Sequence, residues 1–301
     1  MSKERKLSIQ QLPKDKEFLS CFTPRPGNKI IGVDINALEP HVLTHLSQDK
    51  NLLKFYGRGA VKNDIYLYVA SQISAWKEKV RVHYDPLNPT PEGIRAAKEY
   101  AAKERELAKP SYLGWIYGMG AYKMHQDTEL PIEECEQILS ELDRIFCGTE
   151  KLYTHLRKEW EQTGGTLIER WQWDPIKQRR VRKIIAGTPG YIVNGRGRPI
   201  CVGHIKAKDL TNSCVQSTGH DIFEYYLVLM NRRRREQKLD IVPYNVDVHD
   251  ATYWQGPERV MERAAEIFKE SFQELNDTLQ WSVEFKGETK IGDNLGDFLQ
   301  T

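Results

Sequence analysis

Two short segments far apart in the chain decide the fold: residues 32–39 read GVDINALE and residues 247–251 read DVHDA. Each follows a run rich in β-branched residues, so we expect strands at residues 29–34 and 240–247. If the fold brings Asp34 and Asp250 together, they could hold two divalent cations about 3.5–4 Å apart, the arrangement that serves phosphoryl transfer. Taken alone, either aspartate is more typical of an ordinary turn or helix cap.

A third segment, residues 105–118, reads RELAKPSYLGWIYG. It spaces Arg105, Lys109, Leu113 and Tyr117 four apart, so a helix would carry them on one stripe. Two cations followed by an apolar and an aromatic side chain suit a nucleotide that lies along the helix with its phosphates on the cations. Taken alone, the segment fits an amphipathic helix with a solvated basic end at least as well.

The order of these segments resembles that of the family A DNA polymerases, the group of bacterial DNA polymerase I and many phage replicases. Residues 34–47 (DINALEPHVLTHLS) are similar to the family's motif A, residues 105–118 to motif B, and residues 249–250 lie in motif C. Shorter matches follow in the family's order at residues 7–13 (LSIQQLP), 64–66 (DIY), 212–216 (NSCVQ) and 292–296 (GDNLG). So many ordered matches, spread over almost the whole chain, make the resemblance specific.

The resemblance implies a catalytic pair of carboxylates. Asp34 and Asp250 would ligate two Mg²⁺ ions, with the carbonyl of Ile35 as a further ligand, because hard cations prefer oxygen. Motif C has Ala251 where many relatives carry glutamate, so a third acidic residue is missing from that motif.

The resemblance also implies where substrates bind. The triphosphate of the incoming nucleotide would lie on cations, and a glutamate would act as the steric gate against a 2′-hydroxyl. The expected nucleotide-binding residues are Glu39, Arg105, Lys109, Leu113 and Tyr117. The expected contacts to primer–template DNA are Gly118, Lys208, Asn212, Gln216 and His249.

Motif B departs from the family pattern in two ways. Leu113 stands where phenylalanine or tyrosine is usual, which keeps an apolar platform but removes aromatic stacking. Pro110 would cost about 3 kcal/mol in a regular helix interior, so we expect a kink just after Lys109.

The implied fold class is α+β: a polymerase palm, built from an antiparallel sheet with helices, and an inserted helical fingers domain. The palm would comprise residues 1–47, with motif A, and residues 208–301, with motif C; the fingers would comprise residues 48–207, with motif B. Within the fingers, residues 131–163 have the spacing of one or two amphipathic helices. Residues 191–200 suit a hairpin or loop, and residues 80–93, with three prolines, suit an irregular insertion.

The family's thumb subdomain, and usually a 3′→5′ exonuclease-like domain, precede the segment that residues 7–13 resemble. The chain begins at Met1, so we expect no thumb or exonuclease domain in it. A natural split, in which a separate protein supplies those parts, is favoured over a minimal or degenerate polymerase.

Composition is consistent with this reading. The 301 residues are 40% hydrophobic and 29% charged, enough for a substantial core in one or two domains. No segment is apolar enough for a membrane helix, and the lysine-rich N-terminus lacks the core of a signal peptide, so we expect a cytoplasmic protein with no membrane contact, in the host cytoplasm if a phage encodes it. The five scattered cysteines suit buried free thiols rather than zinc or disulfides.

The net charge of +2 does not indicate a nucleic-acid binder. Local basic runs at residues 177–183 (KQRRVRK) and 232–235 (RRRR) could neutralise phosphates, or could equally be solvated surface.

The predicted function is that of a DNA-directed DNA polymerase, a nucleotidyltransferase that adds dNTPs to a primer 3′-hydroxyl. We expect the chain to be the palm-and-fingers subunit of a phage-like replicase. A single-subunit RNA polymerase is the first alternative, and Glu39 argues against it because those enzymes must accept a 2′-hydroxyl. The second alternative is a non-catalytic DNA-binding or replisome-assembly factor derived from a polymerase. Retention of Asp34, Asp250, Arg105 and Lys109 together argues against that alternative, because binding alone does not need all four.

Overall fold

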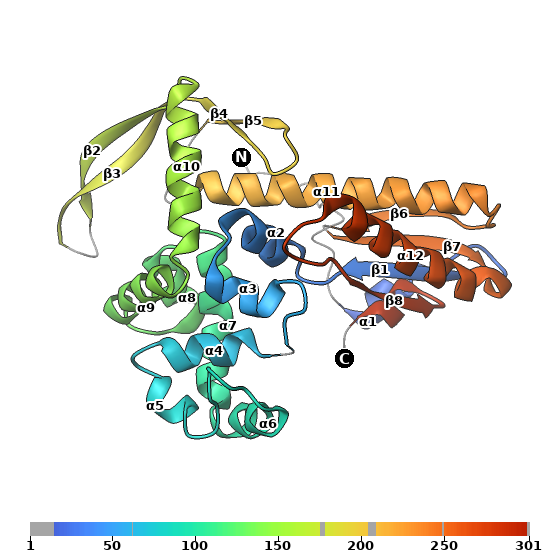
Figure 1. The fold of residues 1–301 in the computed structure, drawn as a ribbon, viewed down its shortest axis with the longest axis horizontal. Helices are drawn as coiled ribbons and strands as arrows, with labels where there is room; N and C mark the ends of the chain where they lie inside the picture. Colours follow the sequence, from blue (N-terminus) through green and yellow to red (C-terminus); the bar gives the residue numbers. More distant parts are fainter. Residues whose placement is uncertain (1–14, 62, 175–177, 204–208, 249, 300–301) are drawn as a thin grey trace. The chain divides into compact units, whose positions relative to one another are not determined.

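The structure is a computed structural model that describes residues 15–61, 63–174, 178–203, 209–248 and 250–299. The chain mixes helices with sheets, as the sequence predicts, and divides into two compact units (Figure 1). The sheet unit comprises residues 1–38 and 219–301, and the helical unit comprises residues 39–218. The palm and fingers ranges stay predictions.

The sheet unit is built on four antiparallel strands in the order β6-β7-β1-β8. The strands are β1 Asn28–Ile35, β6 Val242–Val248, β7 Ala251–Pro257 and β8 Gly287–Gly292. These bounds confirm the strands expected at residues 29–34 and 240–247. The central strand is β1, which pairs with β7 on one side and with β8 on the other.

One face of this sheet is covered by the amphipathic helix α12, Met261–Leu279. Its buried residues recur three or four apart, as a helix with one apolar face requires: Met261, Ala264, Ile267, Phe268, Ser271, Phe272 and Leu275. They pack toward alternate residues of β1, namely Ile31, Val33 and Ile35, which are also buried. Each fully buried side chain of this size contributes roughly 1.5–3 kcal/mol, so this layer holds β1 in place.

The remaining helices of the sheet unit are short, apart from one long helix that runs into both units. They are α1 Lys16–Ser20, η2 Glu258–Val260 and η3 Leu295–Phe298, and the long helix is α11 Asp209–Glu236. The Tyr226 hydroxyl of α11 donates to the carbonyl of Phe268 at 3.2 Å, and the Tyr226 ring stacks on Phe272 at 4.2 Å. The second half of α11 is thereby fixed to α12.

The helical unit contains the other helices and two hairpins. Its helices are α2 Leu38–Ser47, which begins at the boundary, α3 Lys50–Tyr56, α4 Ile65–Gln72, α5 Lys77–Val80, α6 Pro91–Tyr100, α7 Ala102–Ile116, α8 Ala121–Thr128, α9 Ile132–Ile145 and α10 Gly148–Gln162. Its strands are β2 Thr166–Asp174 with β3 Arg179–Thr188, and β4 Gly190–Val193 with β5 Pro199–Val202. Residues 131–163 therefore hold two helices and residues 191–200 a hairpin, as predicted.

The region between α5 and α6 is irregular over residues 81–90, as expected for a proline-rich insertion, but Pro91 begins a helix. Proline suits a first helical position because its missing N–H would be unpaired there anyway. Helix α7 continues through Pro110, so this proline does not end it, and the expected kink stays a prediction.

All five cysteines are free, as expected, but only Cys135 and Cys214 are buried, so the expected burial is wrong for Cys21, Cys147 and Cys201. Within the described part of the chain, no helix has both the length and the apolar character needed to span a membrane.

The buried Asp49 connects α3 to α10. Its Oδ1 accepts the N–H groups of Asn51 and Leu52, which caps α3, and its Oδ2 accepts the N–H of Gly148 at 2.7 Å. The two oxygens therefore satisfy donors at the starts of two helices.

Asp49→Ala should lower the free energy of unfolding by about 2–3 kcal/mol, because it removes a cap and leaves the buried N–H of Gly148 without an acceptor. Urea unfolding followed by circular dichroism measures this. Asp85→Ala is the matched control, because Asp85 caps the N–H of Leu87 in an exposed turn and should cost well under half as much. Equal losses in the two variants would contradict the bridging role.

Candidate active site

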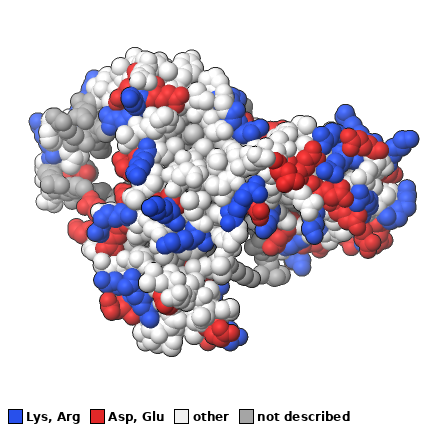
Figure 2. Space-filling view, in the orientation of Figure 1, with Lys and Arg blue, Asp and Glu red and all other residues white. Residues whose placement is uncertain are grey.

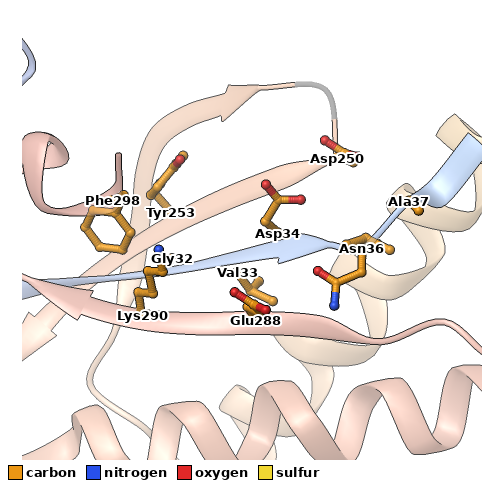
Figure 3. A pocket seen from close by; sticks show the side chains of 11 residues that line it. Gly32, Val33, Asp34, Asn36, Ala37, Asp250, Tyr253, Glu288, Lys290 and Phe298 are labelled. Atoms are coloured by element: carbon orange, nitrogen blue, oxygen red, sulfur yellow. The ribbon is translucent and has the colours of Figure 1, made fainter. Parts of the chain in front are cut away.

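A pocket of about 270 Å³ opens on the sheet unit around the end of β1 (Figure 3). Most of its lining comes from β1 and the turn after it, with further side chains from β7, β8 and η3. The lining residues are Gly32, Val33, Asp34, Ile35, Asn36, Ala37, Asp250, Tyr253, Glu288, Lys290 and Phe298.

Strand register sets the carboxylates of this pocket. Asp34 of β1 stands opposite Ala251 of β7 and opposite Glu288 of β8. Because directly opposite positions of a sheet share a face, Asp34 and Glu288 lie on the same face. Asp250 occupies the tight turn between β6 and β7, and its carbonyl accepts the N–H of Ile35 at 3.0 Å. The structure therefore brings Asp34, Asp250 and Glu288 to one pocket (Figure 3).

Burial and the neighbouring carboxylates together set the electrostatics of this pocket. Partial burial, and then repulsion from Asp250 and Glu288, raise the pKa of Asp34 to about 6, while Lys290 acts in the opposite direction. A divalent cation would relieve this repulsion. Among the described residues no three histidine, cysteine or acidic side chains make a ready metal site. Two carboxylates and a carbonyl nevertheless fit Mg²⁺, which keeps several waters and takes the rest of its ligands from substrate phosphates.

The other end of the pocket carries two aromatic rings beside Lys290, which stands opposite Gly32. Tyr253 stands opposite Gly32, and its ring meets Phe298 edge to face at 5.3 Å. A Cβ at position 32 would lie 2.8 Å from both rings, so only glycine allows them to pack over β1. Burial raises the pKa of Tyr253, and the charges of Asp34 and Asp250 raise it further, so its hydroxyl stays neutral.

In the helical unit, α7 carries the stripe that the sequence predicts. Its buried residues, Ala108, Ser111, Tyr112, Gly114, Trp115 and Ile116, face the interior of the unit. Arg105 and Leu113 are half-buried and Lys109 is exposed, while Tyr117, just beyond the helix end, is 47% exposed. The four residues are therefore the accessible side of this segment.

Two residues beside this stripe had no role in the sequence-based prediction. Asp64 accepts from Nε of Arg105 at 3.0 Å and pairs with its Nη2 at 2.9 Å and with Nζ of Lys98 at 3.1 Å. The Tyr66 ring lies 5.3 Å from Cζ of Arg105 and 6.0 Å from Nζ of Lys109. Both residues belong to the short DIY match, which was the available signal.

The Asp64 side chain favours its ionised form. Burial opposes its ionisation, but hydrogen bonds from the N–H of Leu67 and from Arg105 outweigh burial and hold its pKa below the usual value. Asp64 also caps α4 through the N–H groups of Tyr66 and Leu67. Arg105 is therefore held in one orientation by a carboxylate that is itself fixed by a helix end.

The remaining expected site residues fall in several places. Glu39 is half-buried in the first turn of α2, and Gly118 follows α7 with a φ of 75°. Asn212 and Gln216 are four apart near the start of α11, where Gln216 is exposed. Lys208, His249 and the segment at residues 7–13 lie outside the described residues.

The basic run at residues 232–235 is largely engaged within the sheet unit. Arg232 and Arg233 pair with Glu274 at 2.5 and 2.8 Å, and Arg233 also pairs with Glu270 at 3.0 Å. Arg234 donates to the carbonyl of Ile241 at 3.0 Å. On the face drawn in Figure 2, basic and acidic side chains accordingly mix closely over this unit. These contacts join α11 to α12 and to the start of β6, so three of the four arginines already have structural partners.

Comparison with known proteins now identifies the family. A sequence profile of DNA polymerase family A matches residues 4–297. The chain belongs to DNA polymerase family A. This confirms the resemblance carried by the motifs.

The chain is similar to DNA polymerases of bacteria and phages. DNA polymerase I of Treponema pallidum (strain Nichols) is 21% identical over 300 residues, which cover 98% of this chain and 26% of that protein. The thermostable DNA polymerase I of Thermus thermophilus is 23% identical over 261 residues, covering 87% of this chain and 26% of that protein. The DNA polymerase of Mycobacterium phage D29 is 24% identical over 217 residues, which cover 72% of this chain and 28% of that protein. The chain thus spans about a quarter of the length of these relatives.

A solved structure has the same fold. The POL domain of Pol1 from M. smegmatis, in complex with DNA primer-template and dNTP, superimposes with a TM-score of 0.63 at 17% identity. The match covers 93% of this chain and 42% of that chain.

The raised pKa of Asp34 predicts that this side chain lowers the free energy of unfolding by an amount that depends on pH. Because the folded chain binds this proton more tightly than the unfolded chain, its stability falls as pH rises from 3.8 to about 6. In metal-free buffer, Asp34→Asn should therefore stabilise the chain near pH 7 by more than near pH 5. Urea unfolding at the two pH values measures this, with Asp240→Asn at an exposed position of the same unit as the control. If Asp34→Asn raises the free energy of unfolding by the same amount at both pH values, ionisation of Asp34 does not destabilise the fold.

Proposed function

We propose that the chain is the catalytic part of a DNA-directed DNA polymerase, which adds dNTPs to a primer 3′-hydroxyl by two-metal phosphoryl transfer. The observation that carries this proposal is the meeting of Asp34 and Asp250 in one pocket, where repulsion and partial burial raise the pKa of Asp34 to about 6. Membership in DNA polymerase family A supports it, as does a structural neighbour solved with primer-template and dNTP.

The metal ligands would be the carboxylates of Asp34 and Asp250 with the carbonyl of Ile35. Two Mg²⁺ ions there would supply activation of the 3′-hydroxyl and neutralisation of the leaving pyrophosphate. The tight turn at Asp250 contributes by fixing one carboxylate against the end of β1 through the Ile35 hydrogen bond at 3.0 Å. Preorganisation of this kind matters because misplaced ligands lose charge stabilisation in the transition state.

The triphosphate would bind Arg105 and Lys109. Asp64 is a positioning residue for Arg105, because it engages Nε and Nη2 and leaves the guanidinium oriented before a nucleotide arrives. The Tyr66 ring contacts both cations and keeps them together.

The other substrate contacts follow the family assignment. Glu39 would exclude a 2′-hydroxyl, Leu113 would meet the sugar and base, and Tyr117 would border the base pocket. The primer–template contacts would come from Gly118, Asn212 and Gln216, together with Lys208 and His249.

Asp250→Ala should reduce primer extension by at least about a thousandfold, because one ligand group of both cations is lost. The measurement is single-nucleotide extension of a primed template with Mg²⁺, and thermal unfolding checks that the variant is folded. Asp240→Ala, an exposed aspartate in the same unit, is the control and should extend normally. Extension by Asp250→Ala within about tenfold of the parent would exclude the two-metal site. DNA binding without extension in the parent would favour a non-catalytic, polymerase-derived factor.

Glu288 is a candidate third carboxylate. It stands opposite Asp34 on the β8 side, whereas Ala251, at the position where many relatives have glutamate, stands opposite Asp34 on the β7 side. Glu288 would therefore supply negative charge beside the metals from the other neighbouring strand.

Glu288→Gln should lower kcat by about tenfold to a hundredfold and raise the Mg²⁺ concentration needed for half-maximal rate. The paired variant Ala251→Glu with Glu288→Gln should recover part of the loss if charge beside Asp34 is what matters. Extension assays over a range of Mg²⁺ concentrations measure both effects. An unchanged Mg²⁺ requirement in Glu288→Gln would remove Glu288 from the site.

The separate protein expected to supply a thumb or a 3′→5′ exonuclease domain stays a prediction. The same extension assay tests it with the 301-residue chain alone. Short products per encounter fit a missing partner, and long products would contradict it.

A further inference from the structure

The hairpin β2–β3 is unusual because it exposes two tryptophans. We call it the tryptophan ribbon: Thr166–Asp174 paired with Arg179–Thr188. Figure 1 shows it projecting from the end of α10. Trp171 is 62% exposed and Trp173 is 60% exposed. Large exposed aromatic side chains of this kind mark interaction sites more often than chance surface.

The two indoles lie on the same face of the ribbon. They are two residues apart on β2, so the alternation of a strand puts both on one side, about 7 Å apart along the chain. That spacing lets two successive unstacked bases each meet one ring. Ile168 and Gln172 lie on the opposite face by the same alternation.

Positive charge accompanies the aromatic rings. The two strands carry five basic residues against two acidic ones, but the register sets Lys183 opposite Arg170 and Arg179 opposite Asp174, at positions of the other face. In the register, Arg180 stands opposite Trp173 and Arg182 stands opposite Trp171. Arg180 is exposed, so at least one cation lies beside the rings. Aromatic platforms interleaved with cations are the pattern of single-stranded nucleic-acid binding sites.

The root of the ribbon is fixed to the helical unit. The Thr188 hydroxyl donates to the carbonyl of Gly164 at 2.6 Å and lies 2.9 Å from the Thr166 hydroxyl. Beside it, the fully buried Trp160 donates from Nε1 to the carbonyl of Val202 at 2.9 Å. A Cβ on Gly165 would lie 2.2 Å from the Trp160 ring. The ribbon therefore projects from a packed base rather than from a loose loop.

We propose that the tryptophan ribbon binds single-stranded DNA, as the unpaired template strand of the polymerase reaction. The identity of that strand as template rests on the proposed function, whereas the binding of unpaired DNA rests on the ribbon alone. A duplex would not present its bases for stacking. An acidic peptide would use the arginines but would leave the two indoles unexplained.

Tryptophan fluorescence can report this site directly. Of the seven tryptophans, Trp171 and Trp173 are the exposed pair, and the other five are buried: Trp76, Trp115, Trp160, Trp254 and Trp281. The experiment titrates the full chain with oligothymidylate of about 12 nucleotides, in EDTA and without dNTP. Stacking on the ribbon should quench the emission, and Asp240→Ala, at an exposed position outside the candidate active site, should bind equally well.

Substitutions separate stacking from ribbon stability. Trp171→Val and Trp173→Val keep a residue that favours strands but remove the ring, and each should weaken oligothymidylate binding by roughly tenfold. Trp171→Tyr and Trp173→Tyr should retain most of the affinity for oligothymidylate. Arg180→Gln should reduce the slope of log affinity against log salt by about 0.7. Ile168→Val and Gln172→Val, on the opposite face, are the matched controls and should bind like the parent.

Several results would overturn the proposal. They are an absence of quenching, equal affinity in the double valine variant, or equal quenching by duplex DNA of the same length. Oligoglutamate that binds as tightly as the oligonucleotide, and that the valine variants do not weaken, would assign the ribbon to an acidic peptide instead. Because binding is measured without metal, failure of primer extension would leave this result standing, and failure of binding would leave extension standing.

Discussion

The register of β1 between β7 and β8 is the constraint on which the site depends. It sets Asp34 opposite Glu288 and next to the turn that carries Asp250, and the hydrogen bond from the N–H of Ile35 to the Asp250 carbonyl closes the arrangement. A slip of one residue would turn the side chain of Asp34 toward α12 and the side chain of Val33 to the opposite face of the sheet. The apolar residues of β1 that face α12 prevent this slip, because it would expose them to water. The packing of the core therefore determines the geometry of the carboxylates.

The same arrangement works against local stability. Partial burial and the neighbouring carboxylates raise the pKa of Asp34 to about 6, so ionisation of Asp34 opposes folding. The helix layer on the other face compensates through buried Ile267, Phe268 and Phe272. A site that is strained by charge and supported by an apolar layer is what a cation-binding site requires, since full internal neutralisation would leave no driving force for the cation.

The sequence predicts the elements well where one local pattern decides them. The β-branched runs around β1 and β6, the amphipathic spacing of α9 and α10, and the stripe on α7 all follow from residues near one another in the chain. The family motifs add the meeting of Asp34 with Asp250, which no periodicity shows. Neither local patterns nor the family motifs predict Glu288 as a site residue. The segment GETK around it has no distinctive pattern, and its place beside Asp34 comes from the pairing of β8 with β1. Asp64 and Arg105 are missed as a pair for the same reason: they are 41 residues apart.

The basic runs show most clearly why sequence alone could not assign function to charge. The run at residues 232–235 and the run at residues 177–183 have similar composition, and both suit phosphate binding or solvated surface. In the structure the first run meets glutamates of α12, so most of its charge is engaged within the sheet unit. The second run enters β3, where the register sets Arg180 and Arg182 opposite the two exposed tryptophans and Arg179 opposite Asp174. The net charge of +2 does not distinguish these two basic runs, because it sums all charges of the chain. What separates them is that two arginines of the second run stand opposite aromatic residues, whereas two arginines of the first run pair with glutamates, and only the pairing of distant segments reveals that.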